Sequence, residues 1–192
     1  VPGNLPVINS FENFFFYFLD EYSLLKSGRK WFGERFDLIT TMTFDVDIND
    51  VLPGTNLKFV SGVMASAYSE TSFDVSINMV QSLVQNIPAV LPPIDYDRFT
   101  IRGQSRYDTI TTNADVVNAS NKSKQTIKYV YKKAVGVQSI GFLDFYLLQA
   151  VQQLNLHGSQ INFRSLASIE NPASRFDVGD SSPSASVWDI TN

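Results

Sequence analysis

The 192-residue chain has no cysteine, and this absence removes several kinds of chemistry at once. A disulfide framework, a thiolate metal site and a cysteine nucleophile are all impossible. The single histidine, His157, precedes Gly158 in a turn-like stretch, where histidine is far more often a surface residue than a base or a ligand. Nucleophile-elbow, Walker and dinucleotide-binding glycine patterns are missing as well. We therefore expect no catalytic residue, no metal site and no cofactor in this chain.

Charged residues are also scarce. They make up 18% of the chain, with a net charge of -4 and a pI near 4.9. Nucleic-acid binding needs clustered Lys and Arg, so we expect no nucleic-acid partner. No apolar run reaches the roughly 18 residues of a spanning helix, so we expect no membrane insertion. The chain opens on Val1 without a signal peptide and closes on Asn192 without a terminating element, and we expect it to be a piece of a larger protein.

What the chain has instead is a long apolar run, Ser139–Leu156, interrupted by one acid, Asp144. The run fits both a period of two and a helical stripe, so periodicity alone does not decide its structure. Its aromatic cluster and the turn signal after it favour a strand, although a helical second half from about Gln149 is an alternative. A strand that is apolar on both faces must lie between two layers. We therefore predict Phe142–Leu148 as the central strand of a sandwich.

About ten short segments with strand character, separated by turns, follow one another along the chain. This pattern predicts an all-β fold, an antiparallel β-sandwich that is jelly-roll-like, with at most short helical segments. Leu57–Tyr68 and Ser72–Met79 are predicted as two strands joined by a short hairpin loop. We expect the sandwich to occupy residues 1–180 and residues 181–192, which continue a Gly/Ser/Pro-rich stretch, to be a linker.

Asp45, Asp47 and Asp50 invite comparison with a calcium-binding loop. An EF-hand loop that starts at Asp45 needs glycine at its sixth position and a carboxylate at its twelfth, and those positions hold Asp50 and Asn56. Because the acids alternate with apolar residues, we predict an exposed strand face here instead.

The most unusual segment is Ser27–Glu34, with the sequence SGRKWFGE. Two glycines bracket a basic pair and an aromatic pair, which suits a tight loop with one large side chain folded back into the sandwich. We predict that Trp31 is this buried plug and that the loop contacts the layer of the central strand. A binding role for Arg29, Lys30 and Glu34 is the alternative.

The charges of this loop need partners. Glu34 is close enough in sequence to neutralise Arg29 or Lys30. Alternatively, Arg29 would form a bidentate pair with Asp144, whose charge is otherwise costly to bury inside an apolar run.

Three segments of the chain occur in a distinctive order: SGRKWFGERFD at Ser27–Asp37, GFLDFYLLQAVQQLNLHGSQINFRSL at Gly141–Leu166, and VWDITN at Val187–Asn192. In order and spacing they resemble the PorU family, the type IX secretion system sortases of Bacteroidetes, which are gingipain-like cysteine peptidases. The resemblance covers nearly the whole chain, apart from Val80–Tyr107. The signature positions are Gly28, Arg29, Trp31, Phe32, Gly33, Glu34, Gly141, Leu143, Asp144, Val187, Trp188 and Asp189.

The resemblance implies an activity for the whole family: removal of a C-terminal sorting domain from secreted cargo at the outer membrane, with attachment of the product to a surface lipopolysaccharide. The family's catalytic Cys and His follow the VWD motif, so the resemblance carries no catalytic residue onto this chain. It implies a non-catalytic β domain on the extracellular face of the outer membrane. The implied partners are the adjacent peptidase domain of the same chain and other type IX secretion components.

A carbohydrate-binding jelly-roll module of a surface protein is the alternative function. Aromatic side chains such as Trp31, Tyr68, Tyr96 and Tyr107 would then stack on sugar rings, although aromatic residues at alternating positions usually belong to the packing.

Overall fold

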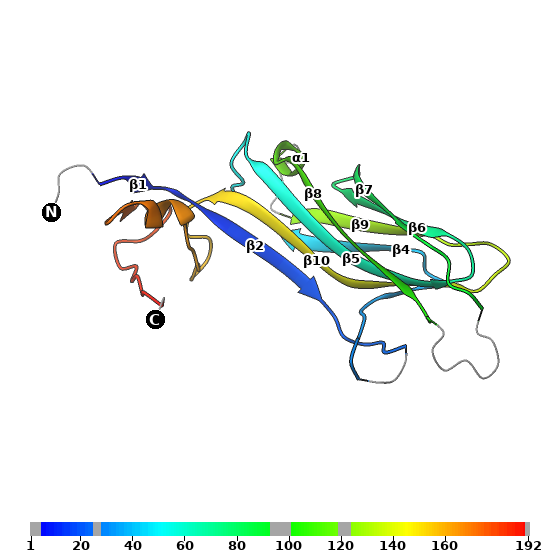
Figure 1. Ribbon diagram of the computed structural model, residues 1–192. Coiled ribbons are helices and arrows are strands. Elements are labelled where there is room, and N and C mark those ends of the chain that lie inside the picture. The colour runs from blue at the N-terminus through cyan, green and yellow to red at the C-terminus, as the bar shows by residue number, and fades with distance from the viewer. Residues whose placement is uncertain (1–4, 25–27, 93–100, 119–123, 191–192) are drawn as a thin grey trace.

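Two antiparallel sheets face each other across one core in the computed structural model, which describes residues 5–24, 28–92, 101–118 and 124–190 (Figure 1). We call the sheet with strand order β2-β10-β5-β8 the front sheet and the sheet with order β4-β9-β6-β7 the back sheet. The front strands are β2 (Ser10–Phe18), β10 (Ser139–Gln153), β5 (Asn56–Ala67) and β8 (Gln104–Asn113). The back strands are β4 (Thr41–Asp47), β9 (Lys124–Lys132), β6 (Thr71–Ile77) and β7 (Val80–Ile87).

The shorter elements lie at the margins of the sandwich. A two-residue strand, β3 (Arg35–Phe36), continues the edge of the front sheet beside β10. At one end of the molecule, β1 (Val7–Ile8) pairs in parallel with β11 (Arg175–Phe176). The helical elements are α1 (Asp115–Asn118) and the 3-10 helix η1 (Leu166–Glu170). In the described part of the chain, no helix has the length and apolar character needed to cross a membrane.

The strand order is that of a jelly roll. If the eight long strands are counted along the chain, the front sheet reads 1-8-3-6 and the back sheet reads 2-7-4-5. Consecutive strands therefore cross repeatedly between the sheets, which is the double Greek-key arrangement. The all-β antiparallel sandwich predicted from the sequence is confirmed.

The helical alternative for the second half of the apolar run is excluded, and one local prediction is wrong. The stretch from Gln149 is not helical, because β10 stays paired with β2 as far as Gln153. The loop between β5 and β6 is not a hairpin, because these strands lie in different sheets. The hairpin joins β6 to β7, where Asn78 and Met79 both have positive φ, at 50° and 67°, as a tight two-residue hairpin turn requires.

The predicted central strand is confirmed: β10 lies between β2 and β5 and is the longest strand of the front sheet. Its register against β5 shifts by one residue between Leu143 and Phe145, so Asp144 is the extra residue of a β-bulge. A bulge of one residue reverses the alternation of side chains along a strand. For this reason Leu143 before the bulge and Tyr146 after it both face the core, although they are three residues apart.

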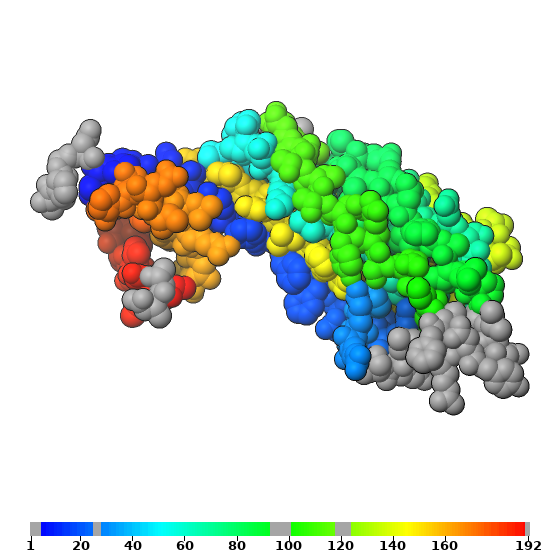
Figure 2. Space-filling view, in the orientation of Figure 1, coloured from blue at the N-terminus to red at the C-terminus, as the bar shows by residue number. Residues whose placement is uncertain are grey.

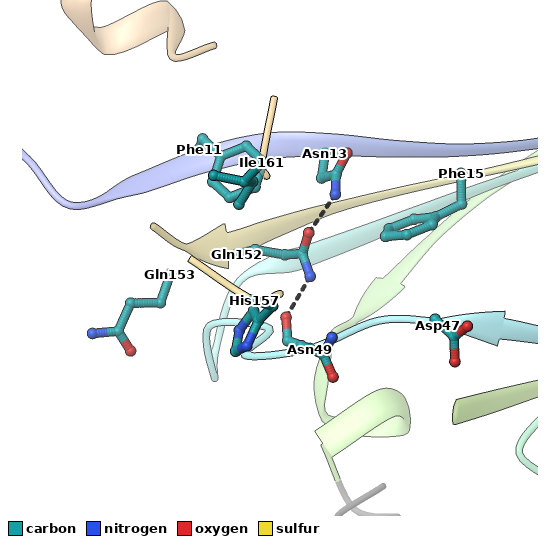
Figure 3. Close-up of a pocket in the computed structure, with 9 residues that line it drawn as sticks. All are labelled: Phe11, Asn13, Phe15, Asp47, Asn49, Gln152, Gln153, His157 and Ile161. Atoms are coloured by element: carbon teal, nitrogen blue, oxygen red, sulfur yellow. Dashed lines mark hydrogen bonds between the residues drawn. The ribbon is translucent and has the colours of Figure 1, made fainter. Parts of the chain in front are cut away.

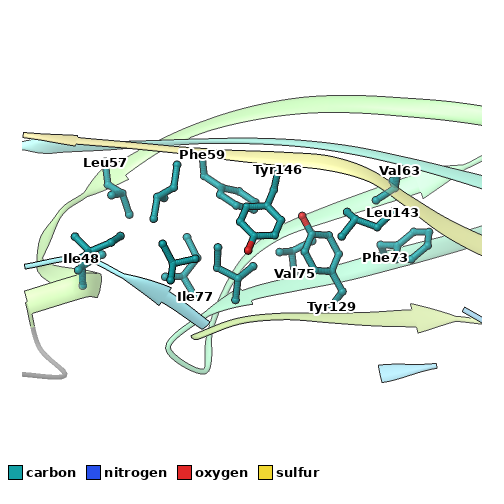
Figure 4. Packing of buried hydrophobic residues seen from close by; sticks show 14 of the residues in the cluster. Ile48, Leu57, Phe59, Val63, Phe73, Val75, Ile77, Tyr129, Leu143 and Tyr146 are labelled. Atoms are coloured by element: carbon teal, nitrogen blue, oxygen red, sulfur yellow. The ribbon is translucent and has the colours of Figure 1, made fainter. Parts of the chain in front are cut away.

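Aromatic rings fill the space between the sheets (Figure 4). Tyr146 of β10 stacks on Tyr17 of β2, with ring centroids 5.0 Å apart and ring planes 11° apart. Phe44 of β4 meets the edge of Tyr146 from the back sheet, at 5.6 Å. These contacts join the first, second and last long strands of the fold, which are far apart in the sequence.

A buried polar cluster lies within this apolar core. The Ser61 hydroxyl on β5 is 2.7 Å from Oε1 of Gln85 on β7 and 2.8 Å from the hydroxyl of Tyr129 on β9. All three side chains are fully buried, and burial raises the pKa of Tyr129, so its hydroxyl stays protonated and available as a donor. The cluster connects the two sheets through hydrogen bonds where apolar packing alone would leave these groups unsatisfied.

Gly141 makes room for the rings of the back sheet. A Cβ atom at this position would lie 2.6 Å from Cζ of Phe73 and 3.0 Å from Cδ2 of Tyr131. We expect Gly141→Ala to lower the free energy of unfolding by about 1–3 kcal/mol, as overpacking of a dense core does. Urea denaturation measures this loss. Gln153→Ala, at an exposed position of the same strand, is the control and should cost less than about 0.5 kcal/mol. Equal urea midpoints for wild type and Gly141→Ala would mean that the two rings move aside freely.

Candidate docking surface

The signature loop reaches the central strand at the bulge. The N–H of Gly33 donates to the carbonyl of Leu143 at 2.7 Å, and the N–H of Leu143 donates to the carbonyl of Glu34 at 3.0 Å. Gly33 is needed there because a Cβ atom would lie 3.0 Å from both Cβ and the carbonyl oxygen of Leu19. The structure thus brings together two signature segments that are about a hundred residues apart in the sequence, as the predicted contact between loop and central strand requires. Ser27, the first residue of the predicted loop, lies outside the described residues.

The aromatic plug of the loop is Phe32, and the prediction that Trp31 is buried is wrong. Phe32 is 4% exposed and packs with Phe142 of β10 and Met64 of β5 in a small apolar cluster outside the main core. Trp31 is 41% exposed, and its indole N–H donates to the carbonyl of Gly28 within the loop. Of two adjacent aromatic residues in extended backbone only one can face the sheet, and pairing of Phe32 with Tyr22 turns Phe32 inward.

Lys30 holds the loop against the outer face of the front sheet. Its ammonium lies 3.4 Å from Oδ2 of Asp144 and hydrogen-bonds the hydroxyl of Tyr107, which itself donates to Asp144 at 2.9 Å. The ammonium also lies over the rings of Phe32 and Tyr107, at 5.0 and 4.9 Å from their centroids. Asp144 is therefore paired with Lys30. One of the two pairings expected from the sequence was between Asp144 and Arg29, the residue that precedes Lys30.

The pKa of Lys30 is raised in this setting. Partial burial is the largest single influence and lowers it, but the hydrogen bond to Tyr107 and the charge of Asp144 together outweigh that effect. The charged form of Lys30 is thus the form that the folded loop stabilises.

One of the two pairings expected from the sequence was between Glu34 and a loop cation. In the described part of the chain, Oε1 of Glu34 instead accepts a hydrogen bond from the Tyr17 hydroxyl of β2. Desolvation, followed by this hydrogen bond, raises the pKa of Tyr17, so the phenol remains a donor at physiological pH. The other carboxylate oxygen, Oε2, is buried without a hydrogen-bond partner among the described residues. The alternative of a binding role would use an exposed carboxylate, whereas the Glu34 side chain is half-buried. Its side chain is instead part of the contact between loop and sheet.

The C-terminal signature lies far from the loop. Val187 and Trp188 are 78% and 83% exposed, and the stretch runs along the opposite end of the molecule from the signature loop (Figure 1). Asp189 is exposed as well. Of the three signature segments, the fold therefore joins the first two and leaves the third apart.

Aromatic rings gather on the outer face of the front sheet, near the loop. The register places Phe18 of β2, Phe145 of β10, Gly62 of β5 and Tyr107 of β8 in one row across all four strands. The rings of Phe145 and Tyr107 stack at 6.0 Å over Gly62, where a Cβ atom would come within 2.9 Å of both. We call this surface the aromatic face; its residues are Phe14, Phe16, Phe18, Tyr107 and Phe145.

The aromatic face is unusually open for such apolar side chains. Phe16 and Phe18 are 58% and 60% exposed, and the centroids of their rings lie 5.4 Å apart. The ring centroid of Phe16 also lies 5.7 Å from that of Phe145, so the rings form a continuous strip from β2 towards β8. This face is not among the features predicted from the sequence. The available signal was the presence of aromatic residues at consecutive positions of β2, which no single buried face can accommodate.

A small cavity of about 150 Å³, lined by both apolar and polar side chains, lies at the other end of β2 (Figure 3). Gln152 of β10 crosses it: its carbonyl accepts from Nδ2 of Asn13 at 2.6 Å, and its amide donates to the carbonyl of Asn49. His157 lies beside it with Nε2 2.8 Å from Oδ2 of Asp50. Since the amides bond one another, the cavity is first of all a polar connection between the sheets.

Two further predictions concern ligands. Asp45 and Asp47 are exposed on β4, as predicted for a solvent-facing strand, and no cluster of His, Asp or Glu that could hold a metal occurs among the described residues. Of the aromatic residues named for sugar stacking, Trp31 and Tyr107 are exposed and Tyr68 is half-buried. Tyr96 lies outside the described residues.

Together, the fold and the surface define a jelly-roll β-sandwich domain with an uncovered aromatic face. No family model and no curated protein matches the sequence. The fold, however, matches part of the crystal structure of dimeric latent PorU from Porphyromonas gingivalis, with a TM-score of 0.67 and 18% sequence identity. The match covers 93% of this chain and 16% of that chain, so this chain has a PorU-like fold over nearly its whole length.

Solved structures of other kinds of protein match less well. The insecticidal delta-endotoxin Cry8Ea1 from Bacillus thuringiensis has a TM-score of 0.36 at 13% identity, over 56% of this chain and 17% of that one. A Cry1Da tryptic core variant from the same organism has a TM-score of 0.32 at 12% identity, over 57% and 17%. These scores are too low to show a shared fold.

The two adjacent aromatic residues of the loop provide an internal comparison. We expect Phe32→Ala to lower the free energy of unfolding by about 3 kcal/mol, because it removes a buried ring from a packed cluster. Trp31→Ala should cost less than about 1 kcal/mol, because much of its ring is already in water. In a chain of this size, the difference corresponds to a melting temperature lower by about 4–8 °C for Phe32→Ala. A larger loss for Trp31→Ala would contradict the assignment of Phe32 as the plug.

The contact of Lys30 with Asp144 and Tyr107 predicts a dependence on alkaline pH. A raised pKa in the folded state means that the contact stabilises the fold fully below the ordinary pKa of 10.5, and that this stabilisation is lost as the pH rises through the folded-state pKa. Wild type should therefore melt above Lys30→Met at pH 8, and the difference should shrink as the pH rises above 10.5 and through the raised folded-state pKa. A difference that stays constant across this range would show that the lysine stem, rather than its charge, makes the contribution.

Proposed function

We propose that this chain is a non-catalytic β-sandwich domain of a type IX secretion system sortase of the PorU kind. In this proposal it supports and docks to the peptidase domain of the same protein, at the extracellular face of the outer membrane. Its match to 16% of latent PorU, over 93% of its own length, is the observation that carries the proposal. Because the chain has no cysteine, the thiolate of a cysteine peptidase would have to come from another region.

The aromatic face supports a docking role. Large apolar patches that stay open on a domain commonly mark the surfaces that another domain or protein covers, and aromatic residues are enriched at the centres of such interfaces. Phe16, Phe18, Phe145 and Tyr107 form a connected strip of this kind. The exposed Trp188 and Val187 of the C-terminal signature supply a second uncovered apolar surface, near the other end of the molecule. Other components of the secretion system are further candidate partners.

The contact between loop and central strand has a supporting role in this proposal. Gly33, Phe32 and Lys30 attach the loop to β10, and Lys30 fixes Tyr107 of the aromatic face in place. The loop thus borders the docking surface and fixes Tyr107 within it, while Trp31 stays exposed. Residues 181–192 would be the approach to the peptidase domain.

Carbohydrate binding is the second candidate, and the exposure of Trp31 and Tyr107 is the observation that favours it. An exposed ring on a jelly-roll sheet can stack on a sugar in the same way as it packs on a protein. The two candidates differ in their partner: a peptidase domain in one, a surface glycan in the other.

The first test of the proposal is the reading frame that encodes the chain. We expect it to continue past codon 192 into a region that encodes a Cys–His pair, because the proposed parent is a cysteine peptidase. Sequencing the genomic DNA measures this directly. A stop codon at that point, or a downstream region without cysteine, would overturn the assignment to a sortase.

The second test is association of the chain with that downstream region, produced separately and followed by calorimetry. Phe18→Ser should weaken binding about tenfold or more, as removal of a central aromatic contact does. Met79→Ser is the control, since Met79 is an exposed apolar residue on the back-sheet hairpin. No association would overturn the docking role. Binding of the chain to lipopolysaccharide glycan that Tyr107→Ser abolishes would favour the carbohydrate alternative instead.

A further inference from the structure

The outer edge of β2 is an open position for another strand. Strand β2 is the first of the front sheet, with β10 on one side only. The N–H of Leu154 donates to the carbonyl of Asn9 in the register of the two strands, so the odd-numbered residues of β2 bond to β10. The backbone groups of the even-numbered residues, Phe16 and Phe18 among them, therefore point away from the sheet.

Part of this edge is already closed. The N–H of Phe14 donates to the side chain of Asn13 at 2.8 Å, and the guanidinium of Arg164 lies 4.6 Å from the centre of the Phe14 ring. The carboxylate of Glu12 accepts from the N–H of Leu166. Figure 2 shows the C-terminal segment (orange) lying against the start of the chain (blue) at this end. Within the described part of the chain, the open part of the edge thus runs from Phe16 to the end of β2 at Phe18, and Asp20 follows just beyond it.

The open part lacks the features by which proteins usually protect a strand edge. Between Phe14 and Leu19 there is no Lys, no Pro and no bulge, and two rings are mostly exposed. The other front edge, β8, carries an Arg106–Asp108 ion pair, and the back edge β4 carries Asp45 and Asp47. An unprotected apolar edge on a folded domain is a feature of sheets that receive a strand from a partner.

The charged residues around the edge indicate which kind of strand is complementary to it. Asp20 and Glu21, both exposed, stand at its far end, and neither forms an ion pair within the described part of the chain. A second copy of β2 is a poor occupant, because antiparallel pairing centred on Phe16 would place Glu12 opposite Asp20 of the other copy, and like charges that face each other destabilise a pair of strands. A strand with Lys or Arg facing Asp20 and Glu21 and apolar residues facing the Phe rings is complementary.

We propose that β2 captures an extended polypeptide segment by antiparallel strand addition, with a basic residue near the segment's N-terminus and apolar residues at alternate positions after it. The backbone of Phe16 and Phe18 supplies the hydrogen bonds, and their rings supply the apolar contacts. Strand addition at β2 needs no peptidase domain, so it can be tested on the chain by itself.

The probe is the synthetic peptide acetyl-KKVTVTV-amide, mixed with the chain and followed by amide hydrogen exchange. We expect the amides of Phe16 and Phe18 to exchange about fivefold or more slowly in its presence, because both would gain a hydrogen-bond partner. The matched control peptide has the same side chains but N-methyl groups on alternate residues along its pairing edge, which removes its donors. It should give no protection. Equal protection by both peptides would show that the rings bind side chains without strand pairing, and would overturn the proposal.

Charge reversal tests the specificity. Asp20→Lys should weaken binding of the basic peptide about two- to fivefold, the range of a single exposed ion pair, and should improve binding of acetyl-EEVTVTV-amide. Glu70→Lys, an equal charge change in the exposed loop between β5 and β6, should leave both affinities unchanged. Failure of KKVTVTV to slow exchange at Phe16 and Phe18 would overturn strand addition and leave the docking role of the aromatic face unaffected.

Discussion

The β-bulge at Asp144 is the feature on which most of this structure depends. Without the extra residue, the alternation of β10 would send Leu143 and Tyr146 to opposite faces, and only one of them could reach the core. With it, one continuous strand provides core residues on both sides of the bulge. The bulge also marks the point where β2 stops and β3 begins along the same edge of β10, which creates the gap that the signature loop occupies.

The same bulge explains why the loop is attached where it is. It leaves Asp144 and Phe145 together on the outer face, where Tyr107 contacts both of them through its hydroxyl and its ring. Lys30 then neutralises an acid that would otherwise be half-buried without a counter-charge. An ion pair of this kind, partly exposed on the lysine side, adds little stability by itself. Its effect is to fix the position of the loop and of Tyr107.

The front sheet combines a carefully packed inner face with an unprotected outer face. On the inner face, the missing side chain of Gly141 leaves room for the rings of Phe73 and Tyr131. On the outer face, Gly62 leaves room for the rings of Phe145 and Tyr107 in the same way. Phe73 and Tyr131 are almost fully buried, whereas Phe145 is half-buried and Tyr107 is exposed. This difference is the basis of the docking role proposed above, since large open apolar patches commonly mark interaction surfaces. The proposed docking and strand-addition roles both use this asymmetry, the first through the face and the second through the edge of β2.

The sequence by itself determined the class of fold, because strand alternation, turn residues and an apolar run bounded by turns are local properties. It also identified β10 as central, the acids of β4 as solvent-facing, and the contact between the loop and the central strand. It could not determine which of Trp31 and Phe32 is buried, or that Lys30 rather than Arg29 reaches Asp144, because adjacent residues are equivalent in pattern until a distant strand fixes the direction in which each one points. Only the tertiary structure decided these pairings, the crossing of β5 and β6 into different sheets, and the uncovered aromatic face. Burial depends on which strands lie side by side, and strand pairing at large sequence separation leaves no periodic signal in the chain.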